Sequence, residues 1–553
     1  MALYKSLQQG GRRGKRVKAY DYVIVGAGSA GCVLANRLSE DTRAQVLLLE
    51  AGGADSHPLL AMPLGFLAAA RDPALDWGYA TEPELHLNGR SVPLPRGKVL
   101  GGCSTINGMI YMRGHPHDYD EWRELGCTGW GYADVLPYFR KMETSWRGAS
   151  EVHGADGPLS VQRVNSRRLG GEPVWRAAQA AGHQLTSDFS FEQTTGFGEC
   201  EVTVDRKGRR ASTSRAYLRP AASRTNLTVL TGATATRVLM TDRRASGIRY
   251  VHNGDTQEVL ARREVILSCG AYNSPKLLML SGIGPGEHLR EHGIEVVRDL
   301  PGVGRNLSEH PVLYAEFAVR EPITFLNSLR LDRLVGSALL WALRGSGPLA
   351  SLVCNCVLMM KTRPGLARPD IQLMILPVRL DAKPWLPGFG TRQTHVFSVM
   401  VIQLHPASRG RVELRSRGPF ERPKIALNLL ATENDFAEMR RGVAAVRKLF
   451  ATPPLAGLIA AETKPGPEIR DDQALDAYLR ANLRVTQHPV GTCTMGTAAD
   501  AVVCPRLRVR GVENLRIADA SIMPTVPGGN TNAPVIMIAE KAADLIRQDH
   551  SRE

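Results

Sequence analysis

The sequence predicts an α/β fold with two domains, and three observations support this prediction. An apolar, β-rich run at residues 21–25 passes directly into a glycine-rich turn and a helix pattern. The chain has 553 residues, enough for about two to four domain-sized cores. Strand–loop–helix patterns at both ends enclose a middle region with a different composition. We therefore expect a Rossmann-like first domain with a parallel sheet and a second α+β domain with a mostly antiparallel sheet.

The chain divides into four expected segments. Residues 1–19 form a basic, flexible arm rich in Gly and Arg. Residues 20–310 form the main part of the first domain, with inserted lid and loop segments near 60–165. Residues 311–480 form the second domain, and residues 481–553 return to the first domain.

The first strand and the turn after it form the most informative motif. Gly26, Gly28 and Gly31 are spaced as Gly-x-Gly-x-x-Gly between a strand and a helix pattern. This spacing allows a tight turn, close approach of the backbone to a pyrophosphate, and a helix packed closely on its strand. A second strand, 45–50, ends in Glu50, whose carboxylate can accept hydrogen bonds from ribose hydroxyls. A lone glycine triplet also fits a purely structural turn, but the complete βαβ unit predicts a dinucleotide site.

Two further segments carry turn and helix signals. Residues 96–108 contain a glycine pair, small hydroxyl residues and an Asn, which fits a loop making close backbone contacts or an ordinary Gly-rich loop. The buried strand pattern 265–271 returns the chain to the parallel sheet. A helix follows over 274–284, with Ser274 as its N-cap and Pro275 at its first position.

The middle of the chain mixes strand and helix patterns separated by prolines. Strands are expected at 371–377, 395–404 and 411–414, and helices at 329–344 and 433–452.

Strand–loop–helix patterns resume near the C-terminus. A strand is expected at 515–519 and a helix at 533–547. This similarity to the first segment is the reason for assigning the C-terminal segment to the first domain.

Composition restricts the partners. The formal net charge is +15, which fits a basic surface, nucleic acid or anionic lipid. No basic strip interleaved with aromatic residues supports nucleic acid, so we expect no nucleic-acid partner. The nine cysteines are scattered without ligand spacing, which favours a reduced, cytoplasmic protein without a metal. No apolar run of about 18 residues predicts a spanning helix.

The N-terminal arm leaves two alternatives open. Its Arg12-Arg13 pair is not followed by an apolar region, so an export signal is not expected. The arm is either a solvated tail or a peripheral contact with acidic phospholipid head groups.

Five separated stretches resemble the signatures of the glucose–methanol–choline (GMC) oxidoreductase family. They are the Gly26–Gly31 unit, residues 97–108, residues 270–284, residues 488–496 and residues 518–534. The resemblance covers nearly the whole chain after residue 20. It is strongest to the branch of choline dehydrogenases and aliphatic alcohol dehydrogenases.

The resemblance implies an FAD cofactor and a set of residues that bind it. Glu50 matches the ribose contact, and Val238 matches the position whose main chain meets the adenine. Gly102 and its neighbours match the loop beside the isoalloxazine ring, and Asp519 matches a contact to the pyrophosphate–ribityl part. The full expected set is Gly26, Gly28, Ser29, Ala30, Gly31, Glu50, Ala51, Gly102, Asn107, Gly108, Met109, Ile110, Val238, Asp519, Ala520, Thr531 and Asn532.

The resemblance also implies the catalytic pair. His488 matches the active-site base, and Asn530 matches a second position that is His or Asn in different members. The chemistry requires these residue types, because an alcohol gives up a hydride only if its hydroxyl proton also leaves. Asn532 is near enough in sequence to exchange roles with Asn530, whereas His310 and His405 are expected to be structural or pocket-lining.

These residues predict FAD-dependent oxidation of a primary alcohol to an aldehyde. His488 takes the proton, flavin N5 takes the hydride, and the electrons pass to a quinone or another acceptor. The alternatives are an O₂-using alcohol oxidase, a choline dehydrogenase, a hydroxynitrile-lyase-like enzyme and a non-catalytic flavin-binding protein.

Two departures from the family refine this prediction. Some members attach the flavin covalently through a His at the position of Ile106, so we expect non-covalent FAD here. Choline-handling members carry a Glu that faces the quaternary ammonium, and its counterpart here resembles Asn355. An uncharged amide cannot neutralise a cation, so the sequence favours an alcohol other than choline.

Overall fold

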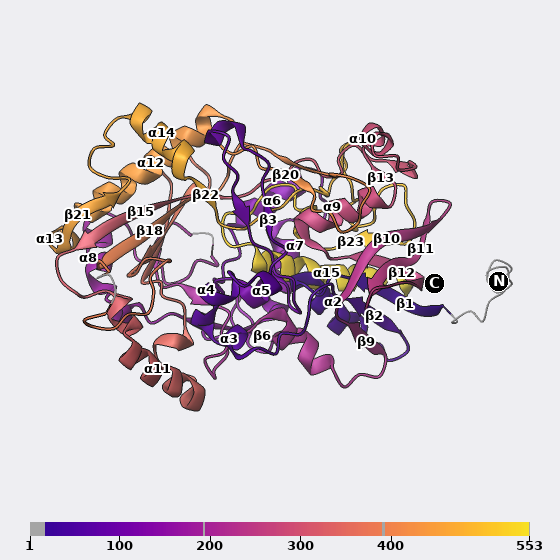
Figure 1. Cartoon of the computed structure of the whole chain (residues 1–553), viewed down its shortest axis with the longest axis horizontal. Helices are drawn as coiled ribbons and strands as arrows, with labels where there is room; N and C mark the ends of the chain where they lie inside the picture. Colours follow the sequence, from indigo (N-terminus) through magenta and orange to yellow (C-terminus); the bar gives the residue numbers. More distant parts are fainter. Residues whose placement is uncertain (1–16, 192–193, 390–392, 552–553) are drawn as a thin grey trace.

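The structure is a computed structural model that describes residues 17–191, 194–389 and 393–551. Two large sheets lie side by side along the longest axis of the molecule (Figure 1). Residues 1–16 of the expected arm lie outside the described residues, whereas Lys18 and Ala19 already belong to the first strand.

The first sheet has a parallel centre and an antiparallel edge. Its order is β10-β11-β12-β1-β2-β9, with β23 paired to β12. Strands β12, β1, β2 and β9 run parallel, and β10 and β11 are antiparallel. The strands are β1 (Lys18–Val25), β2 (Val46–Leu49), β9 (Leu227–Leu230), β10 (Ala233–Thr241), β11 (Arg244–His252), β12 (Asp255–Leu267) and β23 (Leu515–Ile517). The carboxyl ends of the parallel strands meet at one edge, where α/β sheets bind ligands.

Helices from both ends of the chain pack against this sheet. The helix α2 (Ser29–Leu38) contacts α15 (Asn532–His550), while α9 (Gly270–Leu280) contacts β10. Together with the pairing of β23 and β12, these contacts bring the C-terminal segment onto the N-terminal unit (Figure 1).

The expected start of α9 is wrong. The helix begins at Gly270, directly after β12, so Ser274 and Pro275 lie inside it. Proline has no N–H to donate to the carbonyl of Ala271, four residues earlier. The hydroxyl of Thr492 donates to this oxygen instead, at 2.6 Å. The tertiary contact therefore satisfies the acceptor that the proline leaves free.

The second sheet is antiparallel, as the sequence predicts. Its order is β21-β15-β18-β17-β16-β7, with β22 paired to β15. The strands are β7 (Gly196–Gly198), β15 (Pro311–Val319), β16 (Cys356–Met360), β17 (Ile371–Leu376), β18 (Val396–Gln403), β21 (Ile459–Lys464) and β22 (Arg484–Val485). The strand β7 comes from the stretch assigned to the first domain, so the division at residue 310 stays a prediction.

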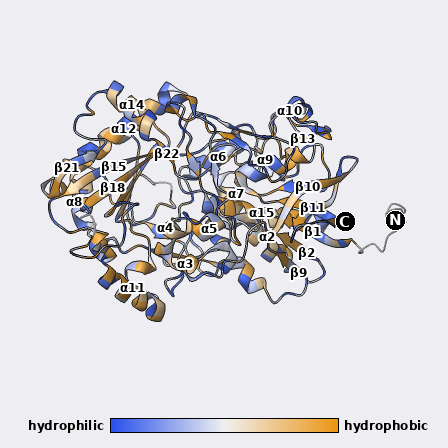
Figure 2. Ribbon diagram, viewed as in Figure 1, coloured by the Kyte–Doolittle hydropathy of each residue, from blue (hydrophilic) through white to orange (hydrophobic). Residues whose placement is uncertain are grey.

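Buried apolar residues form a cluster around each sheet. Figure 2 shows both sheets as largely hydrophobic. The helix α12 (Glu433–Phe450) packs on β17 and β18 of the second sheet. The remaining helices are α3 (Pro58–Ala61), α4 (Phe66–Ala69), α5 (Cys103–Ile106), α6 (Pro116–Glu124), α7 (Tyr132–Met142), α8 (Glu172–Ala180), α10 (Gly286–Glu291), α11 (Leu331–Arg344), α13 (Leu455–Leu458) and α14 (Asp472–Asn482).

Short strands also occur in the segments around the two large sheets. They are β3 (Tyr79–Ala80), β4 (Pro93–Leu94), β5 (Glu143–Ser145), β6 (Leu159–Arg163), β8 (Glu201–Val202), β13 (Ile283–Gly284), β14 (Arg298–Asp299), β19 (Arg411–Glu413) and β20 (Lys424–Ala426).

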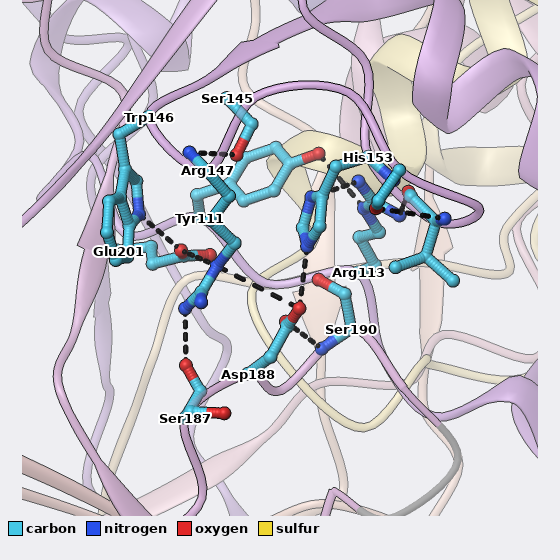
Figure 3. Close-up of polar contacts among 12 residues, drawn as sticks. Tyr111, Arg113, Ser145, Trp146, Arg147, His153, Ser187, Asp188, Ser190 and Glu201 are labelled. Carbon is cyan, nitrogen blue, oxygen red and sulfur yellow. Dashed lines mark hydrogen bonds and ion pairs between the residues drawn. The ribbon is translucent and has the colours of Figure 1, made fainter.

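A buried network of charges anchors the segment 187–190 (Figure 3). The His153 ring lies between two carboxylates, with Nδ1 2.8 Å from Glu143 and Nε2 2.7 Å from Asp188. Arg113 pairs with Glu143 at 2.6 Å. Burial disfavours the imidazolium, but the hydrogen bonds with Asp188 and Glu143 outweigh it and raise the pKa of His153 to about 9. His153 is therefore a buried cation at neutral pH.

The described ranges contain no helix long and apolar enough to cross a membrane. In the same ranges, no group of three or more His, Cys, Asp or Glu side chains is arranged to hold a metal ion.

Candidate functional site

A cavity of about 470 Å³ lies between the two sheets. On one side, Gly26, Glu50 and Ser268 line it, each directly following a parallel strand of the first sheet. On the other side, residues of β15, β17 and β18 line it. The cavity therefore lies where an α/β sheet is expected to bind its ligand.

The first glycine turn leaves no room for side chains. Gly26 has φ +96°, and a Cβ there would lie 2.5 Å from the carbonyl oxygen of Ser268. A Cβ on Gly31 would lie 1.8 Å from the oxygen of Gly26. The helix α2 therefore starts tightly against β1, and its first turn lines the cavity. The N–H groups at the start of a helix have no partner within it, which suits a phosphate.

The second glycine-rich stretch packs directly on the first. Gly102 has φ +52°, and a Cβ there would lie 2.8 Å from Cα of Gly28. The stretch then continues along the cavity wall as residues 106–110. Arg210 holds this wall by donating to the main-chain oxygen of Asn107 at 2.7 Å. Two glycine-rich backbones thus form a narrow cradle in which main-chain groups face the cavity.

Two carboxylates are fixed at this end of the cavity. Glu50 accepts the N–H groups of Ala27 at 2.9 Å and of Gly52 at 2.7 Å. Burial raises the pKa of Glu50 to about 7. Asp519 accepts from the N–H of Gly270 at 2.8 Å. Each carboxylate oxygen can accept a further hydrogen bond, which suits contacts to hydroxyls of a nucleotide.

The cavity brings together nearly all of the residues expected at the cofactor. Those lining it are Gly26, Gly28, Ser29, Ala30, Glu50, Ala51, Gly102, Asn107, Gly108, Met109, Ile110, Asp519, Ala520, Thr531 and Asn532. Gly31 does not line the cavity, but it allows α2 to pack closely on β1.

Val238 is the expected cofactor residue that lies away from the cavity lining. It is buried, and its N–H donates to the Ser281 hydroxyl at 2.8 Å. Residues 233–235, at the start of the same strand, line the cavity instead. The sequence missed them because consecutive small residues in this strand give no signal for the position that faces a ligand.

His488 and Asn530 meet inside the cavity. The Nδ2 atom of Asn530 lies 3.1 Å from Nε2 of His488. On the other side of the ring, the Thr486 hydroxyl lies 2.8 Å from Nδ1. If Nδ1 carries the proton and donates to Thr486, Nε2 presents its lone pair toward Asn530 and the cavity. Oδ1 of Asn530 has no hydrogen-bond partner among the described residues.

The surroundings of His488 keep its imidazole neutral. Burial, together with the neighbouring His310 and the Arg96 cation, holds the pKa of His488 well below the usual value for histidine. Its main-chain N–H donates to Glu309 at 2.5 Å. Burial raises the pKa of Glu309 to about 7 and lowers that of His310 to about 4. The His488 ring is therefore deprotonated at neutral pH, with a lone pair available to a proton donor.

Further residues surround this pair. His310, expected to be structural or pocket-lining, brings its Nδ1 atom within 3.1 Å of His488 Nδ1. The sequence suggested no role for Arg96, a partly buried cation that donates to Gln487 at 2.5 Å and whose Nε has no partner in the described part of the chain. Its position as the first residue of the glycine-rich stretch 96–108 is the signal that could have identified it.

The wall opposite the glycine turns is apolar. The lining side chains there are Phe66, Tyr314, Leu352, Met374, Leu376, Leu380, Met400 and Ile402. Carboxylates in the described lining are those of Glu50 and Asp519, both at the end formed by the first sheet. This wall suits an uncharged, hydrophobic group.

Asn355 does not form this wall. It is fully buried outside the cavity lining, and its main-chain oxygen accepts from the Trp175 indole at 2.9 Å. The apolar wall, and not Asn355, is therefore the feature that disfavours a cationic ligand.

Two sequence models of the GMC oxidoreductase family match this chain, over residues 20–312 and 406–539. Two curated relatives extend over almost the whole chain. An "Oxygen-dependent choline dehydrogenase" of Brucella ovis is 42% identical over 532 residues, covering 95% of each chain. The human "Choline dehydrogenase, mitochondrial" is 44% identical over 539 residues, covering 96% of this chain and 90% of the relative.

A solved structure shares the fold. Pyridoxine 4-oxidase from Mesorbium loti superposes with a TM-score of 0.85 at 30% identity, covering 97% of this chain and 100% of the other.

Proposed function

The chain belongs to the GMC oxidoreductase family, and from this premise we propose that it oxidises an uncharged primary alcohol to an aldehyde. The cofactor is FAD, which the family and its structural relatives bind. The glycine cradle, the two carboxylates and the tight N-terminus of α2 fit its dinucleotide part. When bound, the flavin supplies a hydride acceptor at N5.

The proton step is assigned to His488. A neutral Nε2 lone pair inside the cavity accepts the hydroxyl proton of the alcohol, and a positioned base of this kind contributes about 10²–10⁴-fold to the rate. Asn530 carries an amide N–H donor next to the same nitrogen, which suits stabilisation of the developing alkoxide. The contact between His488 Nε2 and Asn530 Nδ2 is the single observation that supports this proposal most strongly.

The substrate class follows from the apolar wall. Methionine, leucine and isoleucine side chains offer no charge to a quaternary ammonium, whereas they can bury an aliphatic or aromatic body. The aromatic rings of Phe66 and Tyr314 favour either an apolar group or, more weakly, a cation over the ring face.

Choline is the second candidate substrate. The relatives at 42% and 44% identity are named choline dehydrogenases, which favours it. An anaerobic titration with choline and its neutral isostere 3,3-dimethylbutan-1-ol separates the two, because these alcohols differ chiefly in charge. We expect the neutral alcohol to bleach the flavin faster, with an aldehyde as product. Faster bleaching by choline would contradict the proposed substrate class.

The electron acceptor is proposed to be a quinone or another carrier. The name of the Brucella relative contains "oxygen-dependent", which makes molecular oxygen the alternative. Release of peroxide in stoichiometric amounts would identify an oxidase. Turnover of a hydroxynitrile with a flavin that stays oxidised would identify a lyase, and full FAD occupancy without turnover would identify a binding protein.

A further inference from the structure

The helix α11 carries an apolar stripe that faces solvent. Leu331, Val335, Leu339 and Leu343 follow one another at every fourth position and are 44%, 61%, 59% and 82% exposed. Fourteen residues make this helix about 21 Å long. It protrudes from the second-sheet end of the molecule (Figure 1), and much of its ribbon is coloured as hydrophobic (Figure 2). An exposed apolar surface of this kind marks an interaction site.

More exposed apolar side chains flank the start of the helix. Leu386 and Phe389 are 37% and 75% exposed. Their segment is joined to α11 by a hydrogen bond from the N–H of Leu331 to the oxygen of Trp385, at 2.9 Å. The stripe therefore continues beyond the helix onto a neighbouring loop.

Cations lie at both ends of α11. Arg333 is exposed near its start and Arg344 at its end. The Trp341 indole donates to the oxygen of Gly208 at 2.7 Å, which brings the turn 205–209 against the C-terminal half of the helix. This turn exposes Arg206, Lys207 and Arg209. An apolar helix face bordered by arginine and lysine matches an anionic lipid surface in both respects.

We propose that α11 and the turn 205–209 dock the protein on an anionic phospholipid bilayer, with the helix lying in the plane of the interface. This surface is separate from the start of β1, which lies at the opposite end of the molecule (Figure 1). The docking does not depend on which alcohol is oxidised.

Segments adjacent in sequence to the docking surface continue into the cavity wall. Leu376 and Leu380 line the cavity and precede the exposed loop at Leu386, while Leu352 lines it eight residues after α11 ends. This connection rests on the proposed function: the chain links the apolar wall to a surface at the bilayer, where hydrophobic alcohols and quinones concentrate.

Flotation of the full-length, FAD-loaded protein with vesicles tests the docking. Vesicles of phosphatidylcholine alone are compared with vesicles of equal parts phosphatidylcholine and phosphatidylglycerol. The helix variant Val335→Gln/Leu339→Gln/Leu343→Gln is compared with a matched control, Leu85→Gln/Leu125→Gln/Phe420→Gln, whose residues are 82%, 50% and 66% exposed elsewhere on the surface. A charge variant, Arg206→Glu/Lys207→Glu, tests the turn.

We expect the wild type and the control to float with the anionic vesicles and less with the neutral ones. The helix and charge variants should each bind the anionic vesicles at least about tenfold more weakly. Flavin content and alcohol-dependent bleaching in solution should stay the same in all variants, which separates this test from that of the proposed function.

Three results would overturn the docking. These are wild-type protein that stays unbound to both vesicle types, a helix variant that binds like the wild type, or a wild-type oligomer in solution that dissociates only in the helix variant. The last result would assign the stripe to a second copy of the chain.

Discussion

The surroundings of His488 determine its protonation state. The sequence identifies the residue through a motif, but its protonation state depends on burial, on the neighbouring His310 and on the Arg96 cation. These neighbours come from parts of the chain more than a hundred residues away. The sequence motif therefore predicts a catalytic base here, and the burial of His488 favours a neutral ring.

The lowered pKa of His488 makes a prediction about pH. A base with a pKa well below 6.5 stays deprotonated as the pH falls through the usual range for histidine, so the rate of anaerobic flavin reduction should not halve at pH 6.5. Stopped-flow measurements of flavin reduction between about pH 5.5 and pH 8 test this prediction. Glu309, with a pKa of about 7, is the nearby group whose own titration could change the rate in this range. A fall in rate near pH 6.5 that persists in Glu309→Gln would contradict the prediction.

Ile106 makes a second prediction at the residue scale. This side chain lines the cavity at the position where some family members carry the histidine that binds flavin covalently. An aliphatic side chain forms no such bond, so acid or detergent denaturation should release all of the FAD into the protein-free filtrate. Flavin that remains with the precipitated protein would show a covalent attachment elsewhere.

At the scale of elements, Gly31 controls the packing of α2 on β1. A methyl group there would meet the Gly26 oxygen at 1.8 Å, so Gly31→Ala should shift the helix and lower both FAD occupancy and thermal stability. The control is Gly336→Ala in α11, where no atom lies within 4 Å of the added Cβ. That change should stabilise the helix by about 0.5–1 kcal/mol. Equal FAD occupancy in the two variants would exclude a special role for Gly31.

The network around His153 predicts a stability that depends on pH. Its pKa is about 9 in the folded protein and about 6.5 in the unfolded chain. The raised pKa therefore stabilises the fold fully below pH 6.5, and this contribution, about 2–3 kcal/mol at most, is lost as the pH rises toward 9. His153→Gln should have a lower Tm than the wild type at pH 6.5, and the difference should shrink at higher pH. A difference that grows with pH would contradict this assignment.

Elements with strong periodicity were predictable, whereas positions set by tertiary contacts were not. The sequence placed β17, β18, α11 and α12 within a few residues of their observed bounds. It misplaced the start of α9, because a hydrogen bond from Thr492, a residue distant in sequence, satisfies the carbonyl that Pro275 leaves free. It also named Val238 as a cofactor residue, whereas residues 233–235 of the same strand line the cavity, because the direction in which a strand residue points depends on the register of the sheet.

At the scale of the whole molecule, the site is shared between the two sheets. The first sheet and its glycine turns form one end of the cavity, and β15, β17 and β18 form the apolar end. His488 and Asn530 arrive from the C-terminal segment, which folds back on the N-terminal unit through β23 and α15. The family motifs in the sequence indicated the end of the cavity that the first sheet forms. The apolar wall contains no motif, so only the structure identifies the residues that form it.

The central claim is that His488 removes the hydroxyl proton of an alcohol bound against the flavin. Anaerobic stopped-flow reduction of matched FAD-loaded samples of wild type, His488→Ala and His252→Ala, a partly exposed histidine on β11, tests it most directly. We predict that His488→Ala lowers the rate constant of alcohol-dependent bleaching by about 10²–10⁴-fold, while His252→Ala leaves it unchanged. An unchanged rate constant in His488→Ala at full FAD occupancy would contradict the account.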